Sequence, residues 1–207
     1  MHPRIGEIPG SAPNIITGCF NGDIFFWTYN PSLPEQKSIK MKAHGDRINS
    51  IRFCDTGNAF LTASYDKTWS IWDFKKLKEI SNQKGHLKEI HTLSVHPDNS
   101  LVFTGDLAGW GMVWDLRIGK AVYELGTSNS ILCSDFHPNG YELAIGSKNN
   151  LTEIFDLRRK QAVKSIPAHI KLISSLQYNE EGTLLMTGSH DCTVKLWHGR
   201  NYTGTDE

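Results

Sequence analysis

The feature that most constrains the fold of this chain is an internal repeat of about 42 residues. The stretch SYDKTWSIWD at 64–73 returns as SHDCTVKLWH at 189–198. Aromatic residues recur between these copies at steps of 42, 41 and 42 residues: Trp72, Trp114, Phe155 and Trp197. Trp27 lies 45 residues before the first of them. The chain therefore consists of about five copies of one structural unit.

Each copy has the pattern of four short β-strands. In the copy at 43–84, residues 48–53 alternate between apolar and polar. Three further strand-like segments follow, separated by turn residues, at 59–63, 68–73 and 78–81. Period-two alternation with a turn roughly every 8–12 residues is typical of an all-β protein. The sequence therefore predicts an all-β fold.

The repeat also predicts how the chain divides. No first strand is recognisable in the earliest copy, and the last copy ends without a clear fourth strand. The expected divisions are an irregular N-terminal segment (1–14), a partial unit (15–42), three full units (43–84, 85–125 and 126–166), a unit without a clear last strand (167–202) and a tail (203–207).

The opening copy contains the residue types of a hydrolase triad, namely His44, Ser64 and Asp66. A catalytic site needs one asymmetric constellation, whereas a set repeated at a fixed period solves the same packing problem in each copy. We therefore expect no enzyme here, but two structural quartets at an offset of 125 residues: His44, Ser64, Asp66 and Trp72, and His169, Ser189, Asp191 and Trp197.

A unit of about 42 residues with four strands, a Gly-His start and a Trp-Asp end resembles the repeat of the WD-repeat β-propellers. The resemblance implies that each unit is one blade and that the quartet links its loops and strands by hydrogen bonds. Buried indole and imidazole groups need partners, so we expect Asp66 to accept from His44 and Ser64 to bridge towards Trp72. The middle units depart from the pattern, because Ala108 and Asn149 stand where the quartet aspartate is expected.

Three phrases narrow the resemblance: SYDKTWSIWDF, LAGWGMVWDLRIGK and SIPAHIKLISSLQYN. In this order and spacing, over residues 15–198, they resemble the WD-repeat protein of the U4/U6 small nuclear ribonucleoprotein (snRNP), the pre-mRNA processing factor 4 family. That family has seven repeats, so the resemblance implies an incomplete ring of about five blades. It also implies a nuclear, non-enzymatic splicing scaffold that binds snRNP proteins, with U4/U6 snRNA as a further candidate partner, and uses no cofactor or small-molecule substrate. The alternative is a generic WD-repeat adaptor of another nuclear or cytoplasmic assembly.

The resemblance further implies a binding rim. In the family's geometry, the residue before the quartet aspartate and a residue just after Gly-His point to one rim of the ring. Tyr65 is the best single anchor, because aromatic residues dominate interface energetics. Solvated loop residues are the alternative, and Trp110, between two glycines, is either a packing aromatic or an exposed anchor. The candidate binding residues are Tyr65, Lys88, Leu107, Lys148, Lys171 and His190.

Composition argues against several other function classes. Lys plus Arg and Asp plus Glu number 22 each, so bulk charge does not favour nucleic acid or an anionic membrane as the primary partner. No apolar run approaches the ~18 residues that span a bilayer, and the N-terminus does not resemble a signal peptide. The spacing of His86, His91 and His96 places neighbours on opposite faces of a strand, and the four cysteines form no CxxC pair, so no metal site is expected.

Overall fold

The computed structural model describes residues 4–6, 14–28, 38–54 and 59–204. These residues form 19 β-strands in five antiparallel sheets. The prediction of an all-β protein with about five sheets is therefore confirmed. A helix long and apolar enough to span a membrane does not occur in the part of the chain that is described.

The chain forms two compact units, Met1–Ile90 and His91–Glu207, which are described one at a time. The first unit contains two four-stranded sheets. Their strands are β1 (Arg4–Gly6), β2 (Asn14–Gly18), β3 (Asp23–Thr28) and β4 (Ser38–Lys42), followed by β5 (Ile48–Phe53), β6 (Ala59–Ser64), β7 (Thr68–Asp73) and β8 (Lys78–Lys84).

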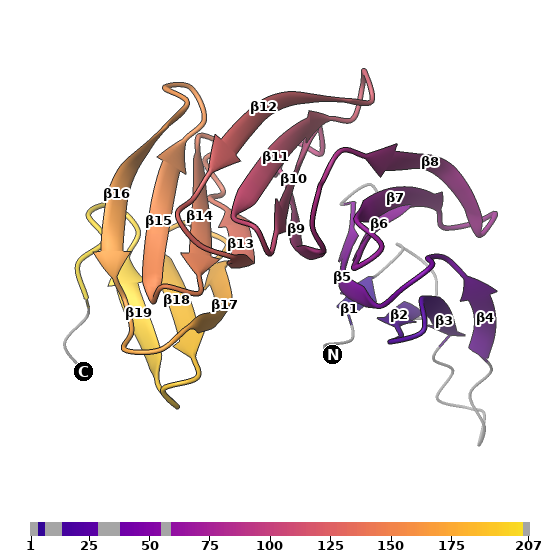
Figure 1. The fold of residues 1–207 in the computed structure, drawn as a ribbon, viewed down its shortest axis with the longest axis horizontal. Coiled ribbons are helices and arrows are strands. Elements are labelled where there is room, and N and C mark those ends of the chain that lie inside the picture. The colour runs from indigo at the N-terminus through magenta and orange to yellow at the C-terminus, as the bar shows by residue number, and fades with distance from the viewer. Residues whose placement is uncertain (1–3, 7–13, 29–37, 55–58, 205–207) are drawn as a thin grey trace. The chain divides into compact units, whose positions relative to one another are not determined.

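The second unit contains two four-stranded sheets and one three-stranded sheet, and consecutive strands of each sheet lie side by side in chain order (Figure 1). The outer strand of the three-stranded sheet makes one isolated bridge, between Trp197 and Gly204. The strands are β9 (Ile90–Val95), β10 (Leu101–Asp106), β11 (Trp110–Asp115) and β12 (Lys120–Gly126); β13 (Ile131–Phe136), β14 (Glu142–Ser147), β15 (Leu151–Asp156) and β16 (Gln161–Pro167); and β17 (Ile173–Tyr178), β18 (Leu184–Ser189) and β19 (Val194–His198).

The N-terminal segment that we expected to be irregular contributes a strand. Strand β1 pairs with β2, with Ile5 opposite Ile15 and Gly6 opposite Asn14. An edge strand of this kind is held by backbone hydrogen bonds, so it needs no alternation of apolar side chains and leaves little trace in the sequence. The first sheet therefore has four strands, while residues 1–3 and 7–13 lie outside the described part of the chain.

Each sheet has two distinct faces. In the second sheet, Trp72 of β7 lies opposite Phe60 of β6, and Ser70 lies opposite Thr62. Because side chains alternate along a strand, these four residues share one face, which we call the tryptophan face. Residues such as Leu61 point to the other side, which we call the opposite face.

Sheets that follow one another within a unit pack the opposite face of one against the tryptophan face of the next. In the first unit, Ile24 and Phe26 of β3 belong to one buried cluster with Phe60 and Trp72. The ring centroids of Phe26 and Phe60 lie 5.4 Å apart at an edge-to-face angle of 73°. Burying such apolar surface is the main stabilising contribution to a stack of sheets.

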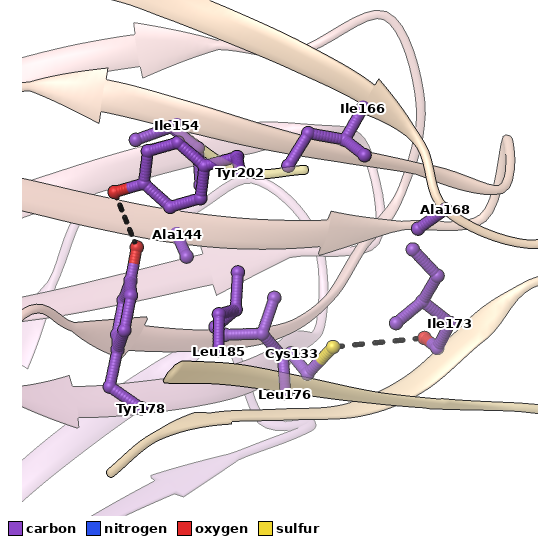
Figure 2. Close-up of a cluster of buried hydrophobic side chains, with 10 residues drawn as sticks. All are labelled: Cys133, Ala144, Ile154, Ile166, Ala168, Ile173, Leu176, Tyr178, Leu185 and Tyr202. Carbon is purple, nitrogen blue, oxygen red and sulfur yellow. Dashed lines mark hydrogen bonds between the residues drawn. The ribbon is translucent and has the colours of Figure 1, made fainter. Parts of the chain in front are cut away.

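The second unit repeats this packing between β13–β16 and β17–β19. Figure 2 shows Ala144 and Ile154 of the earlier sheet in one buried cluster with Leu176 and Tyr178 of the later sheet. The hydroxyl of Tyr178 lies 3.1 Å from that of Tyr202, which is also buried and closes one end of the cluster. Apolar contact thus joins the two sheets, and the Tyr202 hydroxyl adds a hydrogen bond between them by donating to the Glu142 carboxylate of β14.

A tight turn joins the second and third strands of every sheet, and its last residue has a positive φ. Gly22 shows why the turn is constrained, because a Cβ there would lie 2.2 Å from the carbonyl oxygen of His44. The Gly22 oxygen in turn accepts hydrogen bonds from the amides of Ala43 and His44. The turn therefore fixes the loop that begins the next sheet. The equivalent residues are Gly22, Lys67, Gly109, Asn150 and Cys192, with φ between 66° and 89°.

Candidate functional site

A chain of hydrogen bonds joins the loop before β5 to the interior of the second sheet. His44 Nδ1 lies 2.9 Å from Asp66 Oδ2, and His44 Nε2 lies 2.7 Å from Thr62 Oγ1. The indole nitrogen of Trp72 donates to the same Thr62 oxygen at 2.9 Å. With its proton on Nδ1, the His44 ring donates to Asp66 and accepts from Thr62. Every polar group of this hydrogen-bond network therefore has a partner.

Thr62 forms the hydrogen bond to Trp72 that was expected of Ser64. The Ser64 hydroxyl donates to the Asp46 carbonyl and accepts from the Asp66 amide, both at 3.1 Å, so it fastens the turn and does not bridge to Trp72. The sequence contained a signal for this role, because a threonine stands ten residues before the tryptophan in four of the five sheets. These pairs are Thr17 and Trp27 (3.2 Å), Thr62 and Trp72 (2.9 Å), Thr104 and Trp114 (2.8 Å), and Thr187 and Trp197 (3.0 Å).

The second quartet has the same geometry in the last sheet. His169 Nδ1 lies 2.9 Å from Asp191 Oδ2, and His169 Nε2 lies 2.9 Å from Thr187 Oγ1. The Ser189 hydroxyl donates to the Leu172 carbonyl at 2.9 Å and accepts from the Asp191 amide at 3.1 Å. The structure therefore brings the eight proposed quartet residues together in two equivalent networks, each completed by a threonine.

The quartet aspartates are held as carboxylates. Burial opposes ionisation of Asp66, but hydrogen bonds from His44 and Thr68 outweigh it, so the pKa of this carboxyl lies well below its ordinary value. A hydrogen bond from Thr193 is the largest of the effects that lower the pKa of Asp191 in the same way. A charged acceptor strengthens each of these hydrogen bonds and rigidifies the turn that carries it.

The third and fourth sheets lack the quartet aspartate, because Ala108 and Asn149 stand at its position. In the third sheet, buried Asp106 stands at the serine position and accepts from the amides of Ala108 and Trp110, at 2.8 and 3.0 Å. In the fourth sheet, Asn149 makes longer contacts, with a 3.3 Å bond to the Ser128 hydroxyl. Here the turns are held by local side-chain to backbone bonds.

The quartet of the second sheet lies beside a cluster of one exposed and two half-buried side chains in the first unit. The guanidinium carbon of Arg47 lies 5.3 Å from the ring centroid of Tyr65 and 5.6 Å from that of Phe20. The Tyr65 amide donates to the Arg47 carbonyl at 2.9 Å, which ties the turn to the loop. Phe20 is 75% exposed. We call Phe20, Arg47 and Tyr65 the aromatic rim cluster.

Tyr65 was predicted as a binding residue from the sequence, but its two neighbours Phe20 and Arg47 were not. Phe20 stands seven residues before Trp27, as Tyr65 stands seven before Trp72, so the repeat alone could have found it. Arg47 lies outside the positions that the resemblance marked. The approach of these three side chains depends on the packing of β2–β3 beside β5, which the sequence does not reveal.

The other candidate rim residues lie at the surface of their own units. Lys88 of the first unit is exposed, as are Lys148, Lys171 and His190 of the second, and Leu107 is half-buried. Trp110 packs on the backbone of Gly126, where a Cβ would lie 2.8 Å from the ring, yet 46% of its surface is exposed. Trp110 is therefore both packed against the backbone and partly exposed.

Within the described part of the chain, no group of three or more His, Cys, Asp or Glu side chains could hold a metal ion. Two of the regularly spaced histidines bond to backbone instead. His91 Nδ1 lies 2.8 Å from the Leu132 carbonyl oxygen, and His96 Nε2 lies 2.8 Å from that of Gly140.

Several curated proteins are similar to this chain over most of its length. Cross-pathway control WD-repeat protein 2 of Flammulina velutipes is 29% identical over 170 residues, which cover 77% of this chain and 54% of that protein. Small ribosomal subunit protein RACK1 of Caenorhabditis elegans is 28% identical, with coverages of 77% and 53%. RACK1y of Oryza sativa subsp. japonica is 25% identical, with coverages of 79% and 51%. The chain thus spans about half the length of the curated relatives it matches.

These relatives correct the resemblance drawn from the three phrases. They are named as cross-pathway control and ribosomal proteins, so the assignment to the pre-mRNA processing factor 4 family is wrong. The expected snRNP protein and U4/U6 snRNA partners and the nuclear location depended on that assignment and are wrong with it. The phrases misled because they lie in the repeated strand and turn positions, where WD-repeat proteins of different branches share the same packing constraints.

The repeat itself is matched by a general family model. The model described as "WD domain, G-beta repeat" matches residues 35–73, 77–115 and 160–198, which together make up more than half of the chain. Each match ends at or beside the tryptophan that pairs with a threonine of the second strand. The chain belongs to the WD-repeat family.

Proposed function

We propose that this chain is a non-enzymatic adaptor that binds a partner protein through the rims of its sheets. The observation that carries the proposal is the aromatic rim cluster, in which Arg47 lies between Phe20 and Tyr65. Tyrosine and arginine are enriched among the residues that supply most of the binding energy at protein interfaces.

The cluster has the rigidity that a binding site needs. Asp66, directly after Tyr65, accepts hydrogen bonds from the Gly45 amide at 3.0 Å and from the Thr68 hydroxyl at 2.6 Å. These bonds hold the turn and the loop on the sheet beneath them. A partner that binds a pre-ordered cluster loses less conformational entropy on association than one that must order a mobile loop.

Exposed cations favour a partner with an acidic surface. Lys88 lies in the first unit, and Lys148 and Lys171 lie in the second, each at the surface of its unit. Cations at an interface rim act chiefly on the association rate and its salt dependence. We therefore expect charge reversal at these lysines to slow association most strongly at low salt.

The geometry of the triad residue types supports a role without catalysis. Both ring nitrogens of His44 are bonded within the quartet, to Asp66 and Thr62, and the Ser64 hydroxyl is buried and bonded to backbone. A serine nucleophile requires a base within hydrogen-bond reach and access to substrate. Labelling of Ser64 by a serine-reactive probe would contradict the proposal.

The first partner to test is the small ribosomal subunit, because two of the relatives carry that name. The experiment is co-sedimentation of the chain with purified small ribosomal subunits. We expect Arg47→Ala and Tyr65→Ala each to weaken binding at least about tenfold, the usual effect of truncating a central interface residue. The matched controls are Arg158→Ala and Tyr141→Ala, which remove a second Arg–Tyr pair with 4.3 Å between the guanidinium carbon and the ring centroid.

Each outcome is decisive. If the wild-type chain does not co-sediment, the ribosomal partner is wrong. If the rim variants and the controls bind alike, the aromatic rim cluster is not the binding site. If only the rim variants lose binding and all variants keep the wild-type circular dichroism spectrum, the adaptor proposal stands.

A further inference from the structure

Two turns of the second unit bring exposed cations together. One joins β11 to β12 and the other joins β15 to β16, and both lie at the upper side of Figure 1. We call residues 116–120 and 157–160 the basic turns. They contain no acidic residue, and the aspartate before each turn is buried. Their cations are all exposed: Arg117 and Lys120 in the first turn, and Arg158, Arg159 and Lys160 in the second.

The aspartate before each turn holds an arginine of that turn in one orientation. Asp115 accepts hydrogen bonds from Nε and Nη2 of Arg117, at 3.0 and 2.6 Å. Asp156 pairs with the same two nitrogens of Arg158, at 3.4 and 3.3 Å. An arginine has five N–H donors, and this pairing uses only the edge that faces the aspartate. The outer edge of each guanidinium can therefore donate to a second carboxylate, because 73% and 63% of the two side chains are exposed.

Two tyrosines brace the second basic turn. The guanidinium carbon of Arg158 lies 4.3 Å from the ring centroid of Tyr141. The hydroxyl of Tyr123 donates to the carbonyl of Lys160 at 2.7 Å. Tyr123 belongs to β12, so this bond also ties the second basic turn to the sheet that carries the first. The donors of this surface are thus ordered before any partner arrives, which lowers the entropy lost on binding.

The chemistry of the basic turns favours an acidic protein segment. Each buried aspartate neutralises an arginine, which weakens attraction for a polyanion such as RNA, because that attraction depends on uncompensated cations. The direction of the outer N–H donors is unaffected, and a planar fork matches a carboxylate in bidentate geometry. Ile118, next to Arg117 in the chain, is 59% exposed, and Tyr141 is 49% exposed. A partner with apolar side chains among its carboxylates therefore fits this surface.

We propose that the basic turns bind an acidic segment of a partner protein. One carboxylate of that segment accepts from Arg117 and another accepts from Arg158. This surface lies in the second unit and shares no residue with the aromatic rim cluster of the first. The inference goes beyond the proposed function, because it gives the chain a second binding site for a second partner.

The test measures the binding of a fluorescently labelled random copolymer of glutamate and tyrosine by fluorescence anisotropy. This probe supplies carboxylates and apolar rings together. We expect Arg117→Ala and Arg158→Ala each to raise the dissociation constant about tenfold. Arg117→Lys and Arg158→Lys keep the charge but lose the planar fork, so we expect nearly the same loss of binding from them.

The matched control is Arg200→Ala. Arg200 is exposed and stands at the same repeat position after β19, but His198 occupies the position of the paired aspartate. We expect this variant to change the dissociation constant less than about twofold, as is usual for one exposed charge.

Four results would overturn the inference. A wild-type chain that does not bind the copolymer excludes an acidic segment as the partner. Equal binding of polyuridylate at the same salt concentration means that the surface attracts any polyanion. Lysine variants that bind like wild type mean that charge acts without the fork, and an equal loss in Arg200→Ala means that any exposed arginine suffices. Amide exchange of β11 and β15 verifies that each variant remains folded.

Co-sedimentation with small ribosomal subunits separates the two binding sites. We expect Arg158→Ala to lose the copolymer and to keep the ribosomal subunit. Loss of both would overturn the claim of a second partner. If the wild-type chain binds the copolymer but no ribosomal subunit, the ribosomal partner fails and the inference about the basic turns stands.

Discussion

The sheets β5–β8 and β13–β16 solve one packing problem with different chemistry. In the first, Trp72 donates to Thr62, which also contacts the His44 ring. In the second, Phe155 stands at the tryptophan position and Ile145, ten residues earlier, stands at the threonine position. Both Phe155 and Ile145 are buried in the apolar cluster of their sheet.

The difference shows that the tryptophan and the threonine change together. A phenylalanine has no N–H to satisfy, so a hydroxyl at position 145 would gain no partner from Phe155. An isoleucine there contributes apolar contact instead. Replacing both members of a hydrogen-bonded pair by apolar groups costs far less than replacing one. The fourth sheet therefore stays packed without a quartet.

The largest expected effect comes from removing the charged acceptor of the complete quartet. Asp66→Ala leaves His44 Nδ1, the Gly45 amide and the Thr68 amide without their acceptor. We expect the free energy of unfolding to fall by ~3 kcal/mol, because one buried donor and two more exposed donors lose their acceptor at once. Native-state hydrogen exchange of the β6 and β7 amides measures this loss.

The control for that change is Asn149→Ala, at the same repeat position in the fourth sheet. Asn149 makes only 3.3 Å contacts, so we expect a loss below ~0.5 kcal/mol in the exchange of β14 and β15. Equal losses for the two variants would show that the quartet contributes nothing beyond an ordinary turn.

A double-mutant cycle tests whether Thr62 and Trp72 act as a pair. Thr62→Val removes the bonds to Trp72 and His44 and is expected to cost ~2 kcal/mol. Trp72→Phe removes the donor as well as part of the ring. We expect the double variant to be more stable than the sum of the single effects predicts, with a coupling of ~1 kcal/mol. Additive losses would mean that the Thr–Trp bond is not what makes the two positions change together.

Low pH should reduce the stabilisation that the Asp66 carboxylate gives to the second sheet. The pKa of Asp66 is lowered in the folded chain, so the unfolded chain binds more protons in the acid range. The stabilisation by this carboxylate is present in full above the ordinary carboxyl pKa of ~3.9 and is lost as pH falls towards the lowered folded value. We therefore expect the stability difference between wild type and Asp66→Ala to be constant near neutrality and to shrink below pH ~4. A difference that grew on acidification would contradict the assignment.

The sequence predicted the parts of this molecule that repeat and missed the parts that depend on packing. The interval between Trp72, Trp114, Phe155 and Trp197 was enough to predict the sheets. Strand β1 was missed because an edge strand is held by backbone bonds, which leave no side-chain pattern.

The candidate site shows the same limit. Tyr65 could be picked out by its position in the repeat, but Arg47 could not, because its stacking on Phe20 and Tyr65 depends on how the first two sheets pack. Threonine and serine are chemically alike, so the bridging role was given to Ser64 when the geometry gives it to Thr62. The assignment to the pre-mRNA processing factor 4 family was wrong for a related reason. Shared packing constraints make the repeats of different WD-repeat branches similar.

The smallest expected effect concerns a serine that the broken quartet left behind. Ser147 is fully buried at the position of Ser64, but its hydroxyl has no hydrogen-bond partner among the described residues. Burying an unpaired hydroxyl is unfavourable, so Ser147→Ala is expected to raise the free energy of unfolding by ~0.5 kcal/mol. Ser64→Ala removes the bonds to the Asp46 carbonyl and the Asp66 amide and is expected to lower it by ~1 kcal/mol. The two substitutions are chemically identical, so a difference of sign in hydrogen exchange isolates the network around each serine. The same sign at both positions would mean that the Ser147 hydroxyl has a partner of comparable strength.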